Sequence, residues 1–276
     1  MRTSADRDHS YRTASQTRGR LRVLWDLVFG WIRFIRHFAR NVYAIFGIFL
    51  LSGAAIAIAC TWAFSEIAER VRAGGTQSFD NTVMHWMAAH QNPKLQTVML
   101  EITSLGTGTV VTMIVLIAGL FLWLNHHKHS AILLAAATIG GIVLDGLLKI
   151  GFNRPRPQIF KWDTYAVSSS FPSGHAMSSI IVYGTVAYLA ARLQQNARSR
   201  ILTMTLAALI ILLICVSRLY LGVHYPSDVL AGLVIGLAWA AFCMAVLEAL
   251  QLYAKYNAPQ VLEDERPAAK GASPST

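Results

Sequence analysis

The chain contains few charged residues. Of its 276 residues, 14% are charged and 54% are hydrophobic. Soluble domains usually carry about 25% charged residues, so this composition excludes an ordinary water-soluble domain. Several apolar runs approach about 20 residues, the length that a helix needs to cross the hydrocarbon core of a bilayer. The sequence therefore predicts an all-α membrane protein.

Cysteine is also scarce, and no glycosylation acceptor is present. Cys60, Cys215 and Cys243 lie inside the apolar runs, where they indicate small core or lipid-facing residues and not disulfides. Their spacing does not fit a zinc site, so no metal is expected. No Asn-x-Ser/Thr acceptor occurs, so nothing in the sequence indicates a eukaryotic secretory route.

Six apolar runs are interpreted as membrane spans, two of them short and extended as helix by their flanks. They are Val42–Phe64, Leu105–Leu124, Ala131–Leu148, Ala176–Ala191, Ile201–Val216 and Val229–Leu247. With six crossings, two thirds of the 24 Lys and Arg residues fall on the side of the amino terminus. Cytoplasmic loops carry such an excess, so both termini are predicted to be cytoplasmic. The net charge of +10 then reflects topology and not a nucleic-acid partner.

The chain is expected to form one membrane domain with two cytoplasmic flanks. Residues 1–40 form an amino-terminal extension, residues 41–252 the six-span domain and residues 253–276 a tail. Within the extension, Leu21–Arg40 has apolar residues at helical spacing between arginines, which is typical of an amphipathic helix on the inner leaflet. The alternative is a simple extension that follows the charge bias.

Three cations lie at predicted outer helix ends: Lys149, Arg156 and Arg218. Guanidinium groups bind phosphate oxygens in pairs, and lysine adds a compact charge. A single such residue would be explained by its reaching to the membrane interface. Three of them together with histidines indicate a phosphate site.

The segment Pro172-Ser173-Gly174-His175 opens the fourth span. Ser173 is a good helix cap, and Gly174 allows backbone N–H groups to approach an anion closely. His175 in the first turn would be within reach of a phosphate bound there. On its own, this segment could be an ordinary helix cap.

His224 and Asp228 are four residues apart at the start of the sixth span. If the helix begins at His224, both side chains lie on one face, and Asp228 can accept a hydrogen bond from the ring. The other ring nitrogen would then be free to attack phosphorus. The alternative is a capping aspartate beside an interfacial histidine.

The combined spacing Lys-x6-Arg-Pro, Pro-Ser-Gly-His and Ser-Arg-x5-His-x3-Asp resembles the type-2 phosphatidic acid phosphatase superfamily, between about Ser104 and Leu247. The resemblance implies a metal-independent lipid phosphatase without a cofactor. His224 would be the nucleophile, Asp228 would orient it, and His175 would be the general acid and base. The remaining residues would bind the phosphate: Lys149, Arg156, Ser173, Gly174 and Arg218.

The expected function is hydrolysis of a lipid phosphate in a bacterial cytoplasmic membrane, with the site facing outward. Undecaprenyl diphosphate is the favoured substrate, and phosphatidylglycerol phosphate and phosphatidic acid are alternatives. A phosphotransferase that passes the phosphate to an acceptor lipid is a second enzyme class. A lipid-phosphate binding or transport protein is the non-enzyme alternative. The partners expected are the phosphorylated lipid and the membrane; the oligomeric state is left open.

Three further charged residues are weighed without belonging to the predicted site. Arg154 either adds to the positive entrance or faces lipid head groups. Asp145 lies one turn before Lys149 inside a span, where a carboxylate needs a partner, and the spacing predicts that Lys149 is that partner. Asp80 is interpreted as the cap of a short helix that reaches His90 in the long outer loop.

Overall fold

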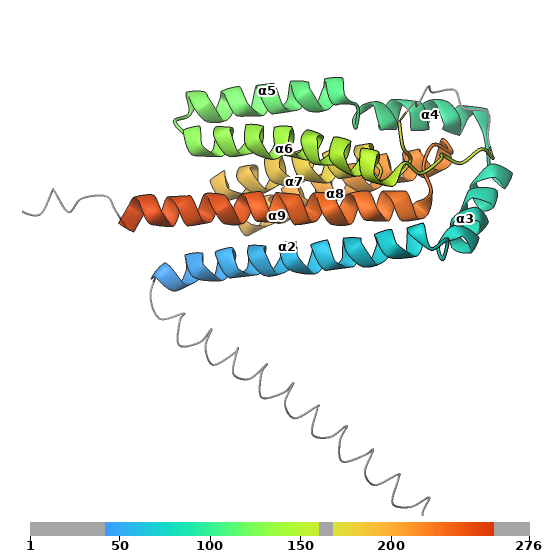
Figure 1. Ribbon diagram of the computed structural model, residues 1–276. Helices are drawn as coiled ribbons and strands as arrows, with labels where there is room; N and C mark the ends of the chain where they lie inside the picture. Colours follow the sequence, from blue (N-terminus) through green and yellow to red (C-terminus); the bar gives the residue numbers. More distant parts are fainter. Residues whose placement is uncertain (1–41, 160–167, 257–276) are drawn as a thin grey trace, which may run out of the picture. The chain divides into compact units, whose positions relative to one another are not determined.

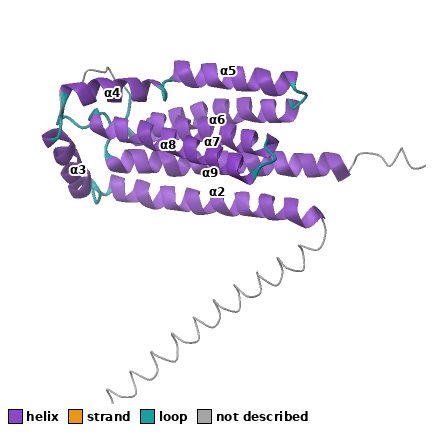
Figure 2. Ribbon diagram, turned by 180° about the vertical axis from the view of Figure 1, so that it is seen from behind, coloured by secondary structure: helices purple, strands orange, loops and turns teal. Residues whose placement is uncertain are grey.

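A computed structural model describes residues 42–159 and 168–256, which form eight helices and no strands (Figures 1 and 2). The helices are α2 (Val42–Arg72), α3 (Gln77–Ala89), α4 (Pro93–Ser104), α5 (Gly108–Leu124), α6 (Lys128–Phe152), α7 (Gly174–Leu193), α8 (Ala197–Tyr220) and α9 (Pro226–Tyr256). The expected amphipathic helix Leu21–Arg40 and the tail beyond residue 256 lie outside the described residues. The chain divides into two units, Met1–Leu51 and Ser52–Thr276, and the candidate site lies entirely in the second.

Five helices are long and apolar enough to cross a membrane: α2, α6, α7, α8 and α9. Helices α4 and α5 form a sixth candidate span when taken together, with a bend of 43° at the break between them. The all-α, multi-pass architecture predicted from the sequence is therefore confirmed. The long outer loop expected before the second span is largely helical, because α2 continues to Arg72 and both α3 and α4 follow.

Helix α7 packs against α5, α6, α8 and α9. Its close approach to α9 depends on glycine. A Cβ atom on Gly232 would lie 2.5 Å from the carbonyl oxygen of Ser173, and one on Gly236 would lie 2.9 Å from that of Met177. Small residues allow membrane helices to pack backbone against backbone. This seam brings the first turns of α7 and α9 together.

The ends of the helices are set by local sequence. Helix α6 stops where Asn153 adopts a left-handed conformation, with φ of 43°, and two prolines follow. After α8, Gly222 has φ of 70°, which glycine adopts readily. Helix α9 then begins with Pro226, a residue favoured in the first helical position. The end of α6, the start of α7, the end of α8 and the start of α9 lie at one end of the helices, where α3 and α4 also lie (Figure 1).

Candidate active site

Backbone hydrogen bonds join the segments that carry the three motifs. The Ser173 N–H donates to the Asp228 carbonyl across 3.0 Å, which ties the start of α7 to the start of α9. The Ser170 N–H donates to the Arg154 carbonyl across 2.8 Å, which closes the loop after α6. The motif residues are thus brought to one place by main-chain contacts.

His224 lies in the turn between α8 and α9 and is 2% exposed. Its Nδ1 atom is 2.8 Å from the carbonyl oxygen of Ser170. Because a carbonyl oxygen only accepts hydrogen bonds, Nδ1 carries the proton and Nε2 keeps its lone pair. Burial lowers the pKa of His224 to about 4, with the charge of Arg218 acting in the same direction and Asp228 opposing it. The ring is therefore neutral near pH 7, with Nε2 available as a nucleophile.

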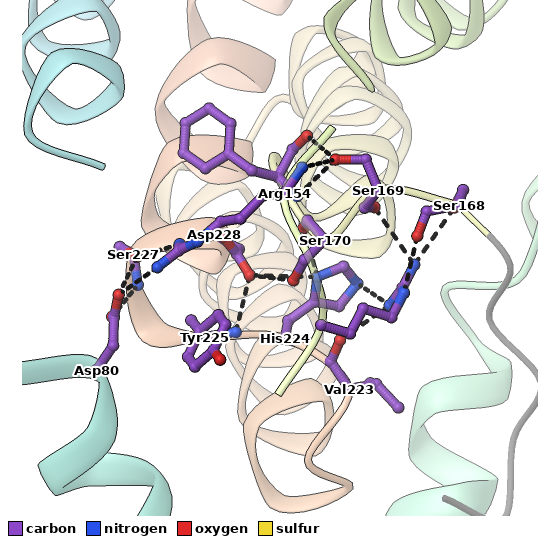
Figure 3. Close-up of polar contacts among 12 residues, drawn as sticks. Asp80, Arg154, Ser168, Ser169, Ser170, Val223, His224, Tyr225, Ser227 and Asp228 are labelled. Atoms are coloured by element: carbon purple, nitrogen blue, oxygen red, sulfur yellow. Dashed lines mark hydrogen bonds and ion pairs between the residues drawn. The ribbon is translucent and has the colours of Figure 1, made fainter. Parts of the chain in front are cut away.

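Asp228 does not form the hydrogen bond to His224 that the sequence suggested. Its Oδ2 atom is 3.8 Å from His224 Nδ1. It accepts instead from the Ser170 hydroxyl and, across 2.8 Å, from the Tyr225 N–H. The reason is that α9 begins at Pro226, so His224 precedes the helix and the four-residue spacing is not a helical turn. Asp228 reaches the histidine through Ser170, whose carbonyl holds the ring (Figure 3).

Arg156 is held by carbonyl groups from two loops. Its guanidinium donates to Ser168 O across 3.0 Å and to Val223 O across 2.8 Å. A third contact, of 3.3 Å, joins Arg156 Nη1 to Nε2 of His224. Burial lowers the pKa of Arg156. Because Nδ1 of His224 carries the proton, Nε2 accepts in this contact, and the Arg156 guanidinium lies directly beside the ring nitrogen that keeps its lone pair.

Lys149 pairs with Asp145 as predicted, with 2.6 Å between Lys149 Nζ and Asp145 Oδ2. Both side chains lie against the first turn of α7. A Cβ atom on Gly174 would be 2.8 Å from Lys149 Nζ and 3.0 Å from Asp145 Oδ2. Glycine at this position leaves room for the ion pair, in addition to the backbone access expected from the sequence.

Arg218 and Ser173 present donors without a partner in the part of the chain that the structure describes. Arg218 is 6% exposed and donates through Nη1 to the Thr103 hydroxyl across 2.7 Å. Among the described side chains, its Nε atom and the Ser173 hydroxyl are both buried without a hydrogen-bond partner. Buried donors of this kind are costly unless something accepts from them. A phosphate would supply those acceptors.

His175 lines a cavity of about 220 Å³ between α5, α6 and α7, together with Lys149 and mainly apolar or small residues. Gly106, at the break between α4 and α5, makes room for the ring, because a Cβ atom there would lie 2.9 Å from His175 Cδ2. The cavity offers a mainly apolar space directly beside the Lys149 ammonium and the His175 imidazole.

Arg154 and Asp80 were not assigned to the site from the sequence, yet both contact it. The Arg154 side chain is only 10% exposed, and its guanidinium binds Asp228 Oδ1 across 2.5 Å and Asp80 Oδ2 across 2.9 Å. Burial alone would lower the pKa of Arg154, but the charges of Asp228 and Asp80 raise it. Asp80 is not a helix cap, since α3 begins at Gln77 and its N-cap residue is Thr76. No local pattern could have revealed this, because the contacts join residues far apart in the chain.

Within residues 42–159 and 168–256, no group of three His, Cys, Asp or Glu side chains is arranged to hold a metal ion. The positive charge of the site comes from the lysine and the arginines described above.

Comparison with known proteins shows what this chain is similar to. The PAP2 superfamily profile matches residues 129–251. A phosphatidylglycerophosphatase B from Bacillus subtilis (strain 168) is 30% identical over 175 residues, which cover 63% of this chain and 86% of that protein. The undecaprenyl-diphosphatase BcrC of the same organism is 29% identical over 154 residues, or 54% and 73% of the two chains.

One solved crystal structure has a fold similar to that of this chain. It is that of a transmembrane PAP2-type phosphatidylglycerolphosphate phosphatase from Bacillus subtilis. It superposes with a TM-score of 0.65 and 26% sequence identity, and the match covers 71% of this chain and 96% of the other.

Proposed function

We propose that this chain, which belongs to the PAP2 superfamily of membrane lipid phosphatases, hydrolyses a lipid phosphate or diphosphate through a phosphohistidine on His224. The observation that carries this proposal is the orientation of His224. Its Nδ1 atom is held by the Ser170 carbonyl across 2.8 Å, and its Nε2 atom lies 3.3 Å from Arg156 Nη1. A neutral imidazole whose unprotonated Nε2 lies beside a phosphate-binding cation is the arrangement that nucleophilic attack on phosphorus needs, once a bound phosphate takes over the contact with Arg156.

The reaction proceeds in two steps. In the first, His224 Nε2 forms a bond to phosphorus while the bond between phosphorus and the leaving oxygen breaks, and His175 gives that oxygen a proton. In the second, His175 takes a proton from water, the water oxygen attacks phosphorus, and the P–N bond breaks. Inorganic phosphate leaves and His224 returns to its neutral form.

The phosphate oxygens are bound by Lys149, Arg156 and Arg218, with donors from Ser173 and the backbone at Gly174. Ser173 and Gly174 open α7, and the start of a helix favours anions through its unpaired N–H groups. These contacts stabilise the charge that develops in the transition state, and the mechanism uses no metal ion.

We propose undecaprenyl diphosphate as the substrate and the outer face of a bacterial cytoplasmic membrane as the location. An outward-facing site suits recycling of that lipid carrier, and the charge bias of the loops supports an outward site. Phosphatidylglycerol phosphate is the second candidate, favoured by the 30% identical relative whose name specifies that activity.

The test is release of inorganic phosphate by the purified full chain in detergent with EDTA. The panel holds undecaprenyl diphosphate, phosphatidylglycerol phosphate and phosphatidic acid. We expect release that survives EDTA and is lost in His224→Ala. His85→Ala is the matched control, because His85 is exposed and its Nδ1 contacts only its own helix, 2.7 Å from Asn81 O.

Other outcomes would favour the alternatives. Phosphate that appears on an acceptor lipid, without free phosphate, would identify a phosphotransferase. Lipid binding without any phosphate transfer, equal in wild type and His224→Ala, would identify a binding or transport protein.

A further inference from the structure

Asp80 lies outside the three motifs and outside the residues matched by the PAP2 profile, yet its side chain is completely buried beside them. Burial of a carboxylate is costly unless it is paired and hydrogen-bonded. Asp80 is fully satisfied in this way. Its carboxylate accepts from the Ser227 N–H across 3.0 Å and from the Ser227 hydroxyl across 2.6 Å, and it pairs with Arg154 across 2.9 Å.

Arg154 divides its guanidinium between two carboxylates. Nη2 binds Asp80, whereas Nη1 binds Asp228 across 2.5 Å and the Ser227 hydroxyl across 2.8 Å. Figure 3 shows Arg154 between Asp80, which comes from α3, and Asp228, which comes from α9. The planar group is thereby fixed from both sides, and each carboxylate is left with a single guanidinium nitrogen.

The chain of contacts continues from Asp228 to the reacting nitrogen. Asp228 accepts from the Ser170 hydroxyl, and the carbonyl of the same serine holds His224 Nδ1 across 2.8 Å. Asp228 and His224 Nδ1 are thus linked through a single residue, Ser170.

We infer that Asp80 is a positioning residue of the active site, which acts through Arg154 and Asp228 to orient His224. This inference rests on the proposed function of His224. Without Asp80, Arg154 would be free to bind Asp228 with both nitrogens, as guanidinium groups bind carboxylates. Asp228 would then be drawn away from Ser170 and Tyr225. Helix α3 is thus part of the catalytic unit.

The test is the variant Asp80→Asn, compared with the wild type on the lipid of the panel that the wild type hydrolyses fastest. The amide oxygen can still accept from the Ser227 N–H, so the change removes the ion pair and the one oxygen that accepts from both Arg154 and the Ser227 hydroxyl. Misplacement of reacting groups by about 1 Å can cost on the order of 100-fold in rate. We expect kcat to fall roughly 10- to 100-fold, with little change in KM or in inhibition by orthovanadate, because the phosphate-binding cations are untouched.

Glu248→Gln is the matched control. Glu248 is also a buried carboxylate in an ion pair, 2.5 Å from Arg192, and lies on the same helix as Asp228. Twenty residues of helix separate Glu248 from Asp228, which corresponds to about 30 Å. The Glu248→Gln variant should lower the melting temperature without changing kcat.

A second variant tests the proposed route. Arg154→Lys has one compact ammonium in place of the planar fork, so it cannot hold both carboxylates in the same way. It should show the same selective loss of kcat. The double variant with Asp80→Asn should be no worse than either single variant, because residues that act through one contact are not additive.

The outcomes separate this inference from the proposed function. Wild-type kcat in a folded Asp80→Asn would overturn the positioning role and leave the phosphatase proposal intact. Failure of Asp80→Asn to fold would assign Asp80 to the fold and would also overturn it. No phosphate release by the wild type from any lipid would overturn the proposed function itself, and the role of Asp80 with it.

Discussion

The hydroxyl of Thr103 is expected to contribute strongly to phosphate binding through Arg218. Thr103 lies on α4 and is 6% exposed, and its oxygen accepts from Arg218 Nη1 across 2.7 Å. Thr103→Val removes this acceptor with little change in shape. A hydrogen bond to a charged group contributes about 1.5–3 kcal/mol, and each 1.4 kcal/mol is about tenfold. We therefore expect kcat/KM to fall roughly 10- to 100-fold.

The assay is steady-state phosphate release in mixed micelles, together with the inhibition constant of orthovanadate. Weaker binding of the phosphate by Arg218 should raise both KM and the inhibition constant of orthovanadate. Thr185→Val is the control, because Thr185 is also a buried threonine but its hydroxyl has no partner among the described residues. It should leave kcat/KM unchanged. A folded Thr103→Val with the kinetics and vanadate inhibition of the wild type would refute the reasoning.

Three further predictions follow from the same geometry. Burial lowers the pKa of His224 to about 4, below its ordinary value of about 6.5. Between these two pH values the unfolded chain therefore binds more protons than the folded chain. The free energy of unfolding should fall as the pH drops from about 6.5 to about 4. Thermal melts should show this fall in the wild type and less of it in His224→Gln; equal slopes would contradict it. Gly232→Ala should lower the melting temperature by forcing α7 and α9 apart, unlike Gly119→Ala, where a Cβ atom would meet nothing within 4 Å. Asp145→Asn should lower activity by misplacing Lys149, and unchanged kinetics would argue against that role.

Much of the fold and of the site could be predicted from the sequence because the signals are local. Apolar runs mark the spans, and the i,i+4 spacing correctly predicted the pair of Asp145 with Lys149. The same spacing brings His224 and Asp228 to 3.8 Å but not into the expected hydrogen bond, because α9 begins only at Pro226 and His224 Nδ1 contacts the Ser170 carbonyl instead. A four-residue spacing is a dependable guide to a direct hydrogen bond or ion pair only when both residues lie inside the helix.

The role of Asp80 and Arg154 could not be predicted, because their contacts are long-range. Asp80 and Arg154 are 74 residues apart, as are Arg154 and Asp228. In the sequence, Asp80 has only the pattern of a helix start, and Arg154 has only the pattern of an interfacial cation. The three-dimensional arrangement was needed to place both beside His224.

The glycine seam between α7 and α9 has a consequence for engineering the protein. The distance between the segment that begins with His175 and the turn that holds His224 is set by two backbones in contact, and not by side chains that could rearrange. Changes on the lipid-facing surfaces of α5 and α8, made to suit another detergent or bilayer, should therefore leave the site unaltered. Gly232 and Gly236 are the positions that such a redesign must keep.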